Sequence, residues 1–170
     1  YVIFNNMADS DVEAVVAYLR TLPAVENAVP RQQILPPDQL PQLERKTGIE
    51  APDPSDTAAR GRYLMTAVLA CSDCHTPLNP ETGAPDFTKF LAGGQPFEGP
   101  WGFIYGGNLT PDQETGLGAW SDDDIKRVLT TGVRIDGRRA VLMPWRSYAD
   151  LTEEDLNAVV NFLRNDLQPV

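Results

Sequence analysis

Residues 70–77 read ACSDCHTP, a stretch that contains both cysteines and the only histidine of the chain. Three chemistries use such a cluster: a dithiol redox pair, a zinc site and covalent attachment of haem. A structural zinc site usually has four ligands, so zinc would need a carboxylate in addition to Cys71, Cys74 and His75. A thioredoxin-type pair begins a helix after a strand, whereas this pair follows a helical pattern. The spacing C-x-x-C-H is the attachment signature of c-type haem, which is the interpretation we favour.

Haem attached in this way has His75 as one axial ligand of the iron, so the question is which residue supplies the second. The chain has three methionines, and Met7 and Met65 are poor candidates. Met7 lies in an N-terminal extension, and Met65 lies on the helix that enters the motif, where we expect it to pack in the core. Met143 lies 68 positions after His75 (143 − 75), in AVLMPW, and the proline that follows it fixes the local backbone. We therefore predict His75 and Met143 as the two ligands.

The periodicity of apolar residues predicts a helical protein with few strand-like segments. In the first and last helices, apolar residues recur at i, i+3, i+4 and i+7. The helix from Ser121 has acids in its first turn and ends at Gly132, and Thr152 is the expected N-cap of the last helix. The predicted helices are 11–22, 56–70, 121–131 and 152–165.

The region between Cys74 and Ser121 is rich in glycine and proline and has little periodicity. A loop of this length is unusual in a compact domain unless it wraps around something. Its aromatic residues need an apolar surface to pack on, and a large flat cofactor would supply one. These residues are Trp101, Phe103, Tyr105 and Trp120.

The charge of the chain is strongly acidic, with 24 acidic and 14 basic residues and a net charge of −10. Such a surface argues against nucleic-acid binding through a basic patch. It favours basic partners, or it simply keeps the protein in solution. No apolar run approaches the roughly 20 residues that a membrane span requires, so we predict no transmembrane segment. The first residue is Tyr1, which suggests a mature or trimmed chain, so the missing signal peptide says nothing about the compartment.

Residues 52–170 resemble the class I cytochromes c. The stretch ARGRYLMTAVLACSDCHTP resembles the first helix of that family and its haem motif. The stretch from GGNLTPDQETGLGAW to LTEEDLNAVV is similar to the repeated domains of multihaem cytochrome subunits of bacterial periplasmic and membrane-bound dehydrogenases. The resemblance implies an all-α class I cytochrome c fold, with helices and long loops wrapped around one covalent haem c. It also implies that the first helix crosses the last, where Gly61 would let Phe162 and Leu163 approach closely.

The sequence predicts three segments: 1–29, 30–54 and 55–170. Residues 30–54 contain six prolines and are interpreted as a linker before the cytochrome c domain. Residues 7–20 align without gaps on 151–164, with six of fourteen positions identical. We interpret residues 1–29 as an extension whose helix resembles the C-terminal helix of a preceding cytochrome domain. The alternative is an unrelated amphipathic helix. On the first interpretation, and because the chain has only one C-x-x-C-H motif, it would be a fragment of a multihaem protein, or a monohaem protein whose preceding domain was lost.

The resemblance implies a one-electron carrier and no enzyme. Its partners would be a dehydrogenase donor, a terminal oxidase or other cytochrome as acceptor, and possible additional haem domains or subunits. The proline-rich arm and its helix could also dock a partner subunit. Haem of this type is attached outside the cytoplasm, so we expect the periplasm or the outer face of the cytoplasmic membrane.

Four residues are candidates to surround the haem or to contact its propionates: Tyr105, Asn108, Trp120 and Arg138. The nitrogen of His75 that does not bind iron needs a partner that orients the ring. Pro77 and Pro100 are both candidates for this role. The alternative function is an open-site haem enzyme, a peroxidase or gas binder, which would apply if Met143 were not a ligand.

Overall fold

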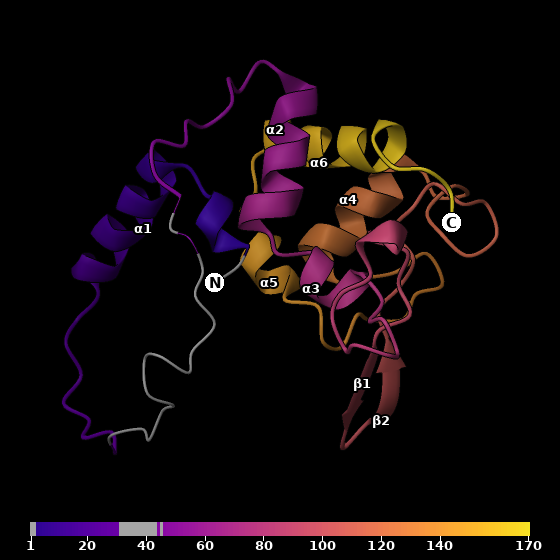
Figure 1. The fold of residues 1–170 in the computed structure, drawn as a ribbon, viewed down its shortest axis with the longest axis horizontal. Helices are drawn as coiled ribbons and strands as arrows, with labels where there is room; N and C mark the ends of the chain where they lie inside the picture. The colour runs from indigo at the N-terminus through magenta and orange to yellow at the C-terminus, as the bar shows by residue number, and fades with distance from the viewer. Residues whose placement is uncertain (1–2, 31–43, 45) are drawn as a thin grey trace. The chain divides into compact units, whose positions relative to one another are not determined.

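The computed structural model describes residues 3–30, 44 and 46–170. It divides the chain into two compact units, Tyr1–Ala51 and Pro52–Val170, which are described separately (Figure 1). Most of the predicted proline-rich linker, residues 31–43 and 45, lies outside the described residues. Within the described ranges, no helix is both long and apolar enough to cross a lipid bilayer.

The first unit contains a short 3₁₀ helix, η1 (Phe4–Asn6), followed by the helix α1 (Asp9–Thr21). The predicted helix over 11–22 is confirmed, with its start two residues earlier. Acidic side chains lie in its first turn and Arg20 lies in its last, which complements the helix dipole. The returning chain is attached at the start of α1, where the amide of Asp9 donates to the carbonyl of Ile49 at 3.0 Å.

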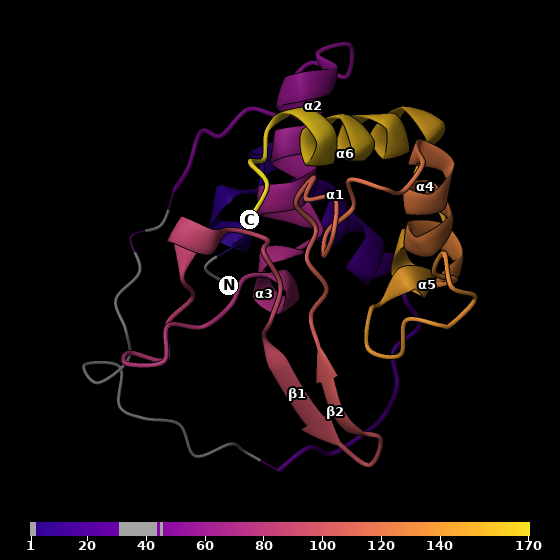
Figure 2. The same ribbon diagram turned by 90° about the vertical axis from the view of Figure 1, so that its right-hand side faces the viewer.

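The second unit is mostly helical, as predicted, and Figure 2 shows the arrangement of its helices. Residues of η3, α4 and α6 share one hydrophobic core. The helices and strands are α2 (Thr57–Tyr63), η3 (Leu64–Val68), α3 (Ser72–His75), η4 (Phe87–Lys89), β1 (Pro96–Gly99), β2 (Gly102–Tyr105), α4 (Asp122–Thr131), α5 (Trp145–Tyr148) and α6 (Glu153–Asn165).

The strands β1 and β2 form an antiparallel hairpin within the region between Cys74 and Ser121, which was predicted to be one long loop. Pro96 pairs with Tyr105 and Gly99 with Gly102, and Gly102 turns the chain with a φ of +83°. Each strand has only four residues, too few for a period of two to stand out among glycines and prolines.

The predicted helix over 56–70 changes its winding halfway along. It begins as α2, capped by Asp56, and continues as η3, a π-helix in which the amide of Leu69 donates to the carbonyl of Leu64 at 2.8 Å. Ala70 then takes a left-handed φ of +55°, which ends the helix directly before Cys71. Single turns of π-helix are frequent at functional sites, and this one borders the C-x-x-C-H motif.

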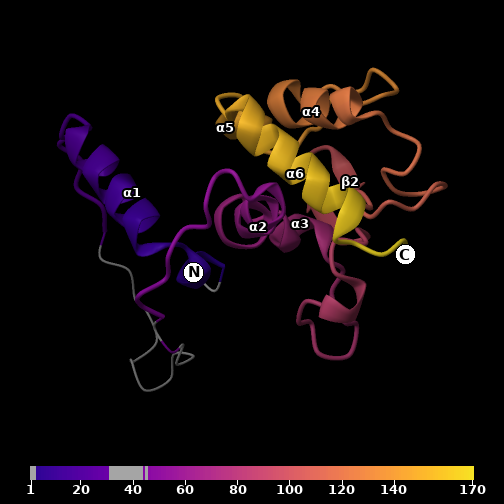
Figure 3. The ribbon, with the colours of Figure 1, turned by 90° about the horizontal axis from the view of Figure 1, so that it is seen from above.

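The helices α2 and α6 cross at close range, as Figure 3 shows from above. A Cβ atom placed on Gly61 would lie 2.0 Å from the carbonyl oxygen of Ala158 and 3.1 Å from the Cβ of Phe162. The prediction that Gly61 permits a close crossing is confirmed for Phe162. The tightest approach is to the backbone of Ala158, and Leu163 is not among the three nearest atoms. A two-pronged ion pair supports the crossing, since Arg60 Nε lies 2.7 Å from Asp155 Oδ1 and Nη2 lies 3.2 Å from Oδ2.

The ends predicted for α4 and α6 are also confirmed. Ser121 and Asp124 form a capping box, and Gly132 ends α4 with a φ of +71°. Thr152 accepts a hydrogen bond from the amide of Asp155 at 3.1 Å and so caps α6. Both helices direct their apolar faces into one core that also includes η3 and the residues before α5.

Candidate functional site

A cavity of about 850 Å³ lies in the second unit, and most of the surface that lines it is apolar. Its walls come from η3, α3, β2, the loop after β2, α4, the segment between α4 and α5, and α6. The volume lies within the range of sites for small molecules and cofactors. The loop between Cys74 and Ser121 therefore forms one wall of a cavity, in agreement with the prediction that it wraps around something.

The two cysteines of the motif line this cavity as free thiols. Cys71 precedes α3 and is buried, whereas Cys74 lies within α3 and is exposed. Burial, followed by the proximity of Cys74, raises the pKa of Cys71 to about 12. Burial and the charge of Asp73 also raise the pKa of Cys74. Both sulfurs are therefore protonated at neutral pH and face the same cavity one helical turn apart.

The imidazole of His75 lines the cavity and has one nitrogen already bound. Its Nδ1 lies 2.8 Å from the carbonyl oxygen of Gly107. Because a carbonyl can only accept, Nδ1 holds the proton and Nε2 keeps its lone pair for a metal. Burial lowers the pKa of His75, although the hydrogen bond to Gly107 opposes this shift, so the ring is neutral at neutral pH. Neither Pro77 nor Pro100, the two candidates from the sequence, orients the imidazole. The carbonyl that accepts from Nδ1 belongs to Gly107.

Gly106 lets the loop after β2 approach the motif closely enough for this bond. A Cβ atom on Gly106 would lie 2.0 Å from the carbonyl oxygen of Cys74. Gly93 donates its amide to the carbonyl of His75 at 2.7 Å from another part of the loop. Glycines from two parts of the loop therefore contact the backbone of α3.

Replacing Gly106 with alanine is expected to push the loop away from α3 and to lower the free energy of unfolding by about 2 kcal/mol. The matched control is Gly107→Ala, since a Cβ on Gly107 meets nothing within 4 Å. This control should change the free energy by less than about 0.5 kcal/mol. Urea unfolding of both variants measures the difference, and equal values would show that the approach to Cys74 is not restrictive.

Two methionines line the cavity, and they differ in their surroundings. Met143 is half-buried in the segment before α5, and its carbonyl accepts from the amide of Trp145 at 2.8 Å. Met65 is only 1% exposed, and its sulfur lies 3.7 Å from the sulfur of Cys71. Met65 is therefore in the core beside the motif, as expected, whereas Met143 reaches the cavity from a different segment.

The four candidates for the haem surround all line the cavity, but their polar groups differ in availability. Both amide atoms of Asn108 are bound within the protein, including a 2.8 Å bond from Nδ2 to the carbonyl of Val170. The Nε and Nη2 atoms of Arg138 are paired with Asp136 Oδ2 at 2.8 and 2.6 Å. Tyr105 is 63% exposed and Trp120 is half-buried.

Sequence reasoning missed Arg134, which lines the cavity with an unsatisfied group. Its Nε is buried and has no hydrogen-bond partner among the described residues, and the Oδ2 of Asp136 lies 3.8 Å away. Its guanidinium carbon lies 5.7 Å from the centre of the Trp120 ring. The turn that places it is closed by a 2.9 Å bond from the Arg134 amide to the carbonyl of Arg138. Only the run of arginines in GVRIDGRR could have suggested such a site from the sequence.

Comparison with known proteins agrees with this arrangement. Residues 56–163 match the family described as "Cytochrome C oxidase, cbb3-type, subunit III". The cytochrome subunit of fructose dehydrogenase from Gluconobacter japonicus is 30% identical over 97% of this chain and 36% of its own length. The cytochrome c subunit of gluconate 2-dehydrogenase from Pantoea cypripedii is 37% identical over 65% of this chain and 23% of its own length.

A third relative, the cytochrome c subunit of alcohol dehydrogenase (quinone) from Gluconobacter oxydans, is 35% identical over 65% of this chain. The chain spans about a third or less of the length of these relatives. The family match covers more than half of the chain and includes the whole C-x-x-C-H motif. The chain therefore belongs to this family of c-type cytochrome domains, which implies covalently attached haem c and the role of an electron carrier.

Proposed function

We propose that Cys71 and Cys74 hold one haem c by thioether bonds and that His75 and Met143 are the axial ligands of its iron. The domain then transfers single electrons between a dehydrogenase-type donor and a downstream acceptor, in the periplasm or on the outer face of the cytoplasmic membrane. The observation that supports this most is the joint placement of two free thiols, a neutral imidazole and a thioether around one apolar cavity.

The residues of the site fit this group. The protonated thiols of Cys71 and Cys74 are available to add across the C=C bonds of two haem vinyl groups, which would give two thioethers, and their separation by one turn suits two vinyl groups of one haem. Gly107 fixes the tautomer of His75 that leaves Nε2 free, as the outer partners of metal-binding histidines generally do. When bound, haem supplies one-electron oxidation and reduction of iron, and a methionine ligand raises its potential.

The apolar walls favour electron transfer over substrate chemistry. Leu129, Val159 and Leu163 are buried and contribute apolar surface to the cavity. A site with two protein ligands has no open position for a substrate. Two arginines could assist an open-site enzyme: Arg138 is paired with Asp136, and the guanidinium of Arg139 lies over the Trp145 ring. Burial of the ring also limits the rearrangement of solvent that accompanies each electron.

Replacing Met143 with alanine is expected to abolish the sulfur-to-iron absorption band of the oxidised holoprotein and to convert the iron to a high-spin form. The matched control is Met65→Leu, because Met65 lines the same cavity but packs against Cys71. Leucine has a similar volume and no sulfur, so this variant should keep the band. Visible spectra of both variants test the assignment, and loss of the band in Met65→Leu alone would make Met65 the ligand.

Within this proposal, Arg134 is the better candidate for a propionate contact than Arg138, because its buried Nε lacks a partner among the described residues. Replacing Arg134 with glutamine removes a positive charge that disfavours ferric iron. We expect the midpoint potential to fall by about 30 to 60 mV, up to a tenfold change in the equilibrium constant. Arg138→Gln should change it less, because Asp136 already offsets that charge. Redox titration compares the two, and a larger shift for Arg138→Gln would contradict this assignment.

A further inference from the structure

Two arginines of the second unit lack the acidic partner that its other arginines have. Six of the eight arginines in residues 52–170 lie within 3.8 Å of a carboxylate oxygen: Arg60, Arg62, Arg127, Arg134, Arg138 and Arg164. Arg139 and Arg146 have no such carboxylate among the described residues, although acidic residues outnumber basic ones by 24 to 14 in the chain. Both side chains are exposed. Their positive charges are therefore available to a partner.

The two unpaired arginines lie at one aromatic ring. Their guanidinium carbons lie 5.9 Å (Arg139) and 5.1 Å (Arg146) from the centre of the Trp145 ring, within the range of cation–π contacts. The ring packs on the end of α4, where a Cβ atom on Gly132 would lie 2.5 Å from its Cδ1. Arg139 is held as well, since its Nη1 donates to the carbonyl of Thr131 at 3.5 Å. These side chains form what we call the arginine–tryptophan cluster: Arg139, Trp145 and Arg146.

The charge of the segment around this cluster is opposite to that of the rest of the chain. Residues 133–148 contain four arginines and one aspartate, which gives a net charge of +3 (4 − 1). The remaining residues therefore carry a net charge of −13 (−10 − 3). A protein surface that carries carboxylates is attracted to this segment and repelled elsewhere, which orients it during the encounter. The net charge alone favours basic partners, whereas its distribution favours an acidic partner at this place.

The arginine–tryptophan cluster lies next to the proposed haem site but is mostly separate from it. Arg139 and Met143 line the large cavity, whereas Trp145 and Arg146 are not among its lining residues. The amide of Trp145 donates to the carbonyl of Met143 at 2.8 Å, so the ring and the proposed ligand belong to one tight turn of the backbone. A partner that contacts the Trp145 ring would therefore lie close to the Met143 side of the site.

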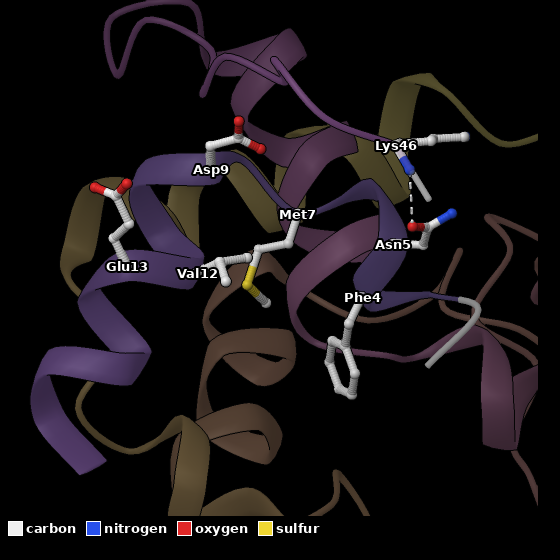
Figure 4. Close-up of a pocket in the computed structure, with 7 residues that line it drawn as sticks. All are labelled: Phe4, Asn5, Met7, Asp9, Val12, Glu13 and Lys46. Atoms are coloured by element: carbon white, nitrogen blue, oxygen red, sulfur yellow. Dashed lines mark hydrogen bonds between the residues drawn. The ribbon is translucent and has the colours of Figure 1, made fainter. Parts of the chain in front are cut away.

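A hollow in the first unit is a poorer candidate for such a partner. It has a volume of about 270 Å³, and Figure 4 shows the side chains around it: Phe4, Asn5, Met7, Asp9, Val12, Glu13 and Lys46. Its lining has two acidic residues and one basic residue. The cation is already bound within the protein, since Lys46 Nζ donates to Asn6 Oδ1 at 2.5 Å. This hollow would therefore repel carboxylates, unlike the arginine–tryptophan cluster.

We propose that the arginine–tryptophan cluster docks a redox protein whose contact surface carries carboxylates around an apolar centre. The carboxylates pair with the guanidinium groups of Arg139 and Arg146, whose planar forks match carboxylate geometry, and the apolar centre packs on Trp145. Arginine and tryptophan are also among the residue types that most often dominate the binding energy of interfaces. The inference rests on the proposed function in one point, that the partner exchanges single electrons with the haem, so that one gains the electron that the other loses.

The first test measures binding of a synthetic polyglutamate peptide to the reduced holoprotein at low ionic strength. In NMR spectra of the isotopically labelled protein, the indole N–H of Trp145 should shift on binding, whereas that of Trp101 should not. The double variant Arg139→Gln, Arg146→Gln, which we call the cluster variant, should bind about tenfold more weakly in calorimetry, because two ion pairs are lost.

The matched control is the double variant Arg20→Gln, Arg62→Gln, which removes two exposed arginines elsewhere and changes the net charge equally. Its affinity for polyglutamate should stay within about twofold of the wild type. Circular dichroism checks that both variants keep their helix content. Stopped-flow oxidation of the reduced holoprotein by ferricyanide, an anion, gives a second readout. The rate constants of the wild type and the control should fall as salt is added, despite the net charge of −10, and the cluster variant should lose this dependence.

Equal affinities of the cluster variant and the control, or an unshifted Trp145 indole, would overturn the proposal. Tighter binding to vesicles of phosphatidylglycerol than to polyglutamate would overturn it in favour of a membrane surface. Sedimentation of the chain alone as a dimer that the cluster variant dissociates would overturn it in favour of a second copy, an association that the net charge of −10 on each copy opposes. Failure of the proposed function is read separately, because a spectrum that shifts with carbon monoxide would contradict the two iron ligands and leave the affinities for polyglutamate unchanged.

Discussion

Replacing both Cys71 and Cys74 by alanine is expected to make all haem extractable from the holoprotein by acidified organic solvent. The wild-type protein should retain its haem under the same treatment, because two thioether bonds do not dissociate when the protein unfolds. The thiols are free, face one cavity and lie one turn apart, which is the arrangement that double attachment requires. Absorption of the protein and solvent phases after extraction measures the effect.

Single replacements separate the two bonds. Cys71→Ala and Cys74→Ala should each retain covalent haem through the remaining thioether. Cys74 is the more exposed of the two, so its loss should disturb the core less than loss of the buried Cys71. If the double variant kept its haem after extraction, the cysteines would not be the attachment sites.

Replacing Gly61 with leucine is expected to destabilise the fold strongly. Even the Cβ atom would lie 2.0 Å from the carbonyl oxygen of Ala158, so α2 and α6 would have to separate. The core residues of α6 that lie against α2 would then lose contacts on one side. We expect a loss of about 3 kcal/mol, at the upper end for overpacked cores, and a fall in Tm of about 10 °C.

The control for this change is Ala58→Leu, which places the same side chain on the exposed face of α2. Leucine and alanine are both good helix formers, so this variant should stay within about 0.5 kcal/mol of the wild type. Thermal unfolding followed by far-UV circular dichroism compares the two. A Gly61→Leu protein as stable as the control would mean that the crossing is looser than described.

The sequence predicted the parts of the fold that depend on neighbours along the chain. Ser121 and Gly132 mark the two ends of α4 through a capping box and a left-handed turn, both local signals. The cluster at 71–75 indicated haem because its chemistry lies within five positions. Gly61 was predicted through the family resemblance rather than from any local pattern.

The remainder depends on how distant segments meet, which local patterns do not encode. The carbonyl of Gly107 reaches His75 across 32 positions, because Gly106 lets the loop pass close to Cys74. Arg134 looks like any surface arginine in the sequence, and only the folded turn buries its Nε. The β1–β2 hairpin was missed because its strands are too short to show a pattern.

The most direct test of the proposed function is an equilibrium redox titration of the full chain, produced in a host that attaches c-type haem and followed by visible absorption. We expect a fully reversible transition of one electron, a low-spin c-type spectrum in both states and no change on addition of carbon monoxide. A high-spin spectrum that shifts with carbon monoxide would contradict a carrier with two protein ligands and would indicate an open iron site. A protein without haem absorption would contradict the haem site altogether.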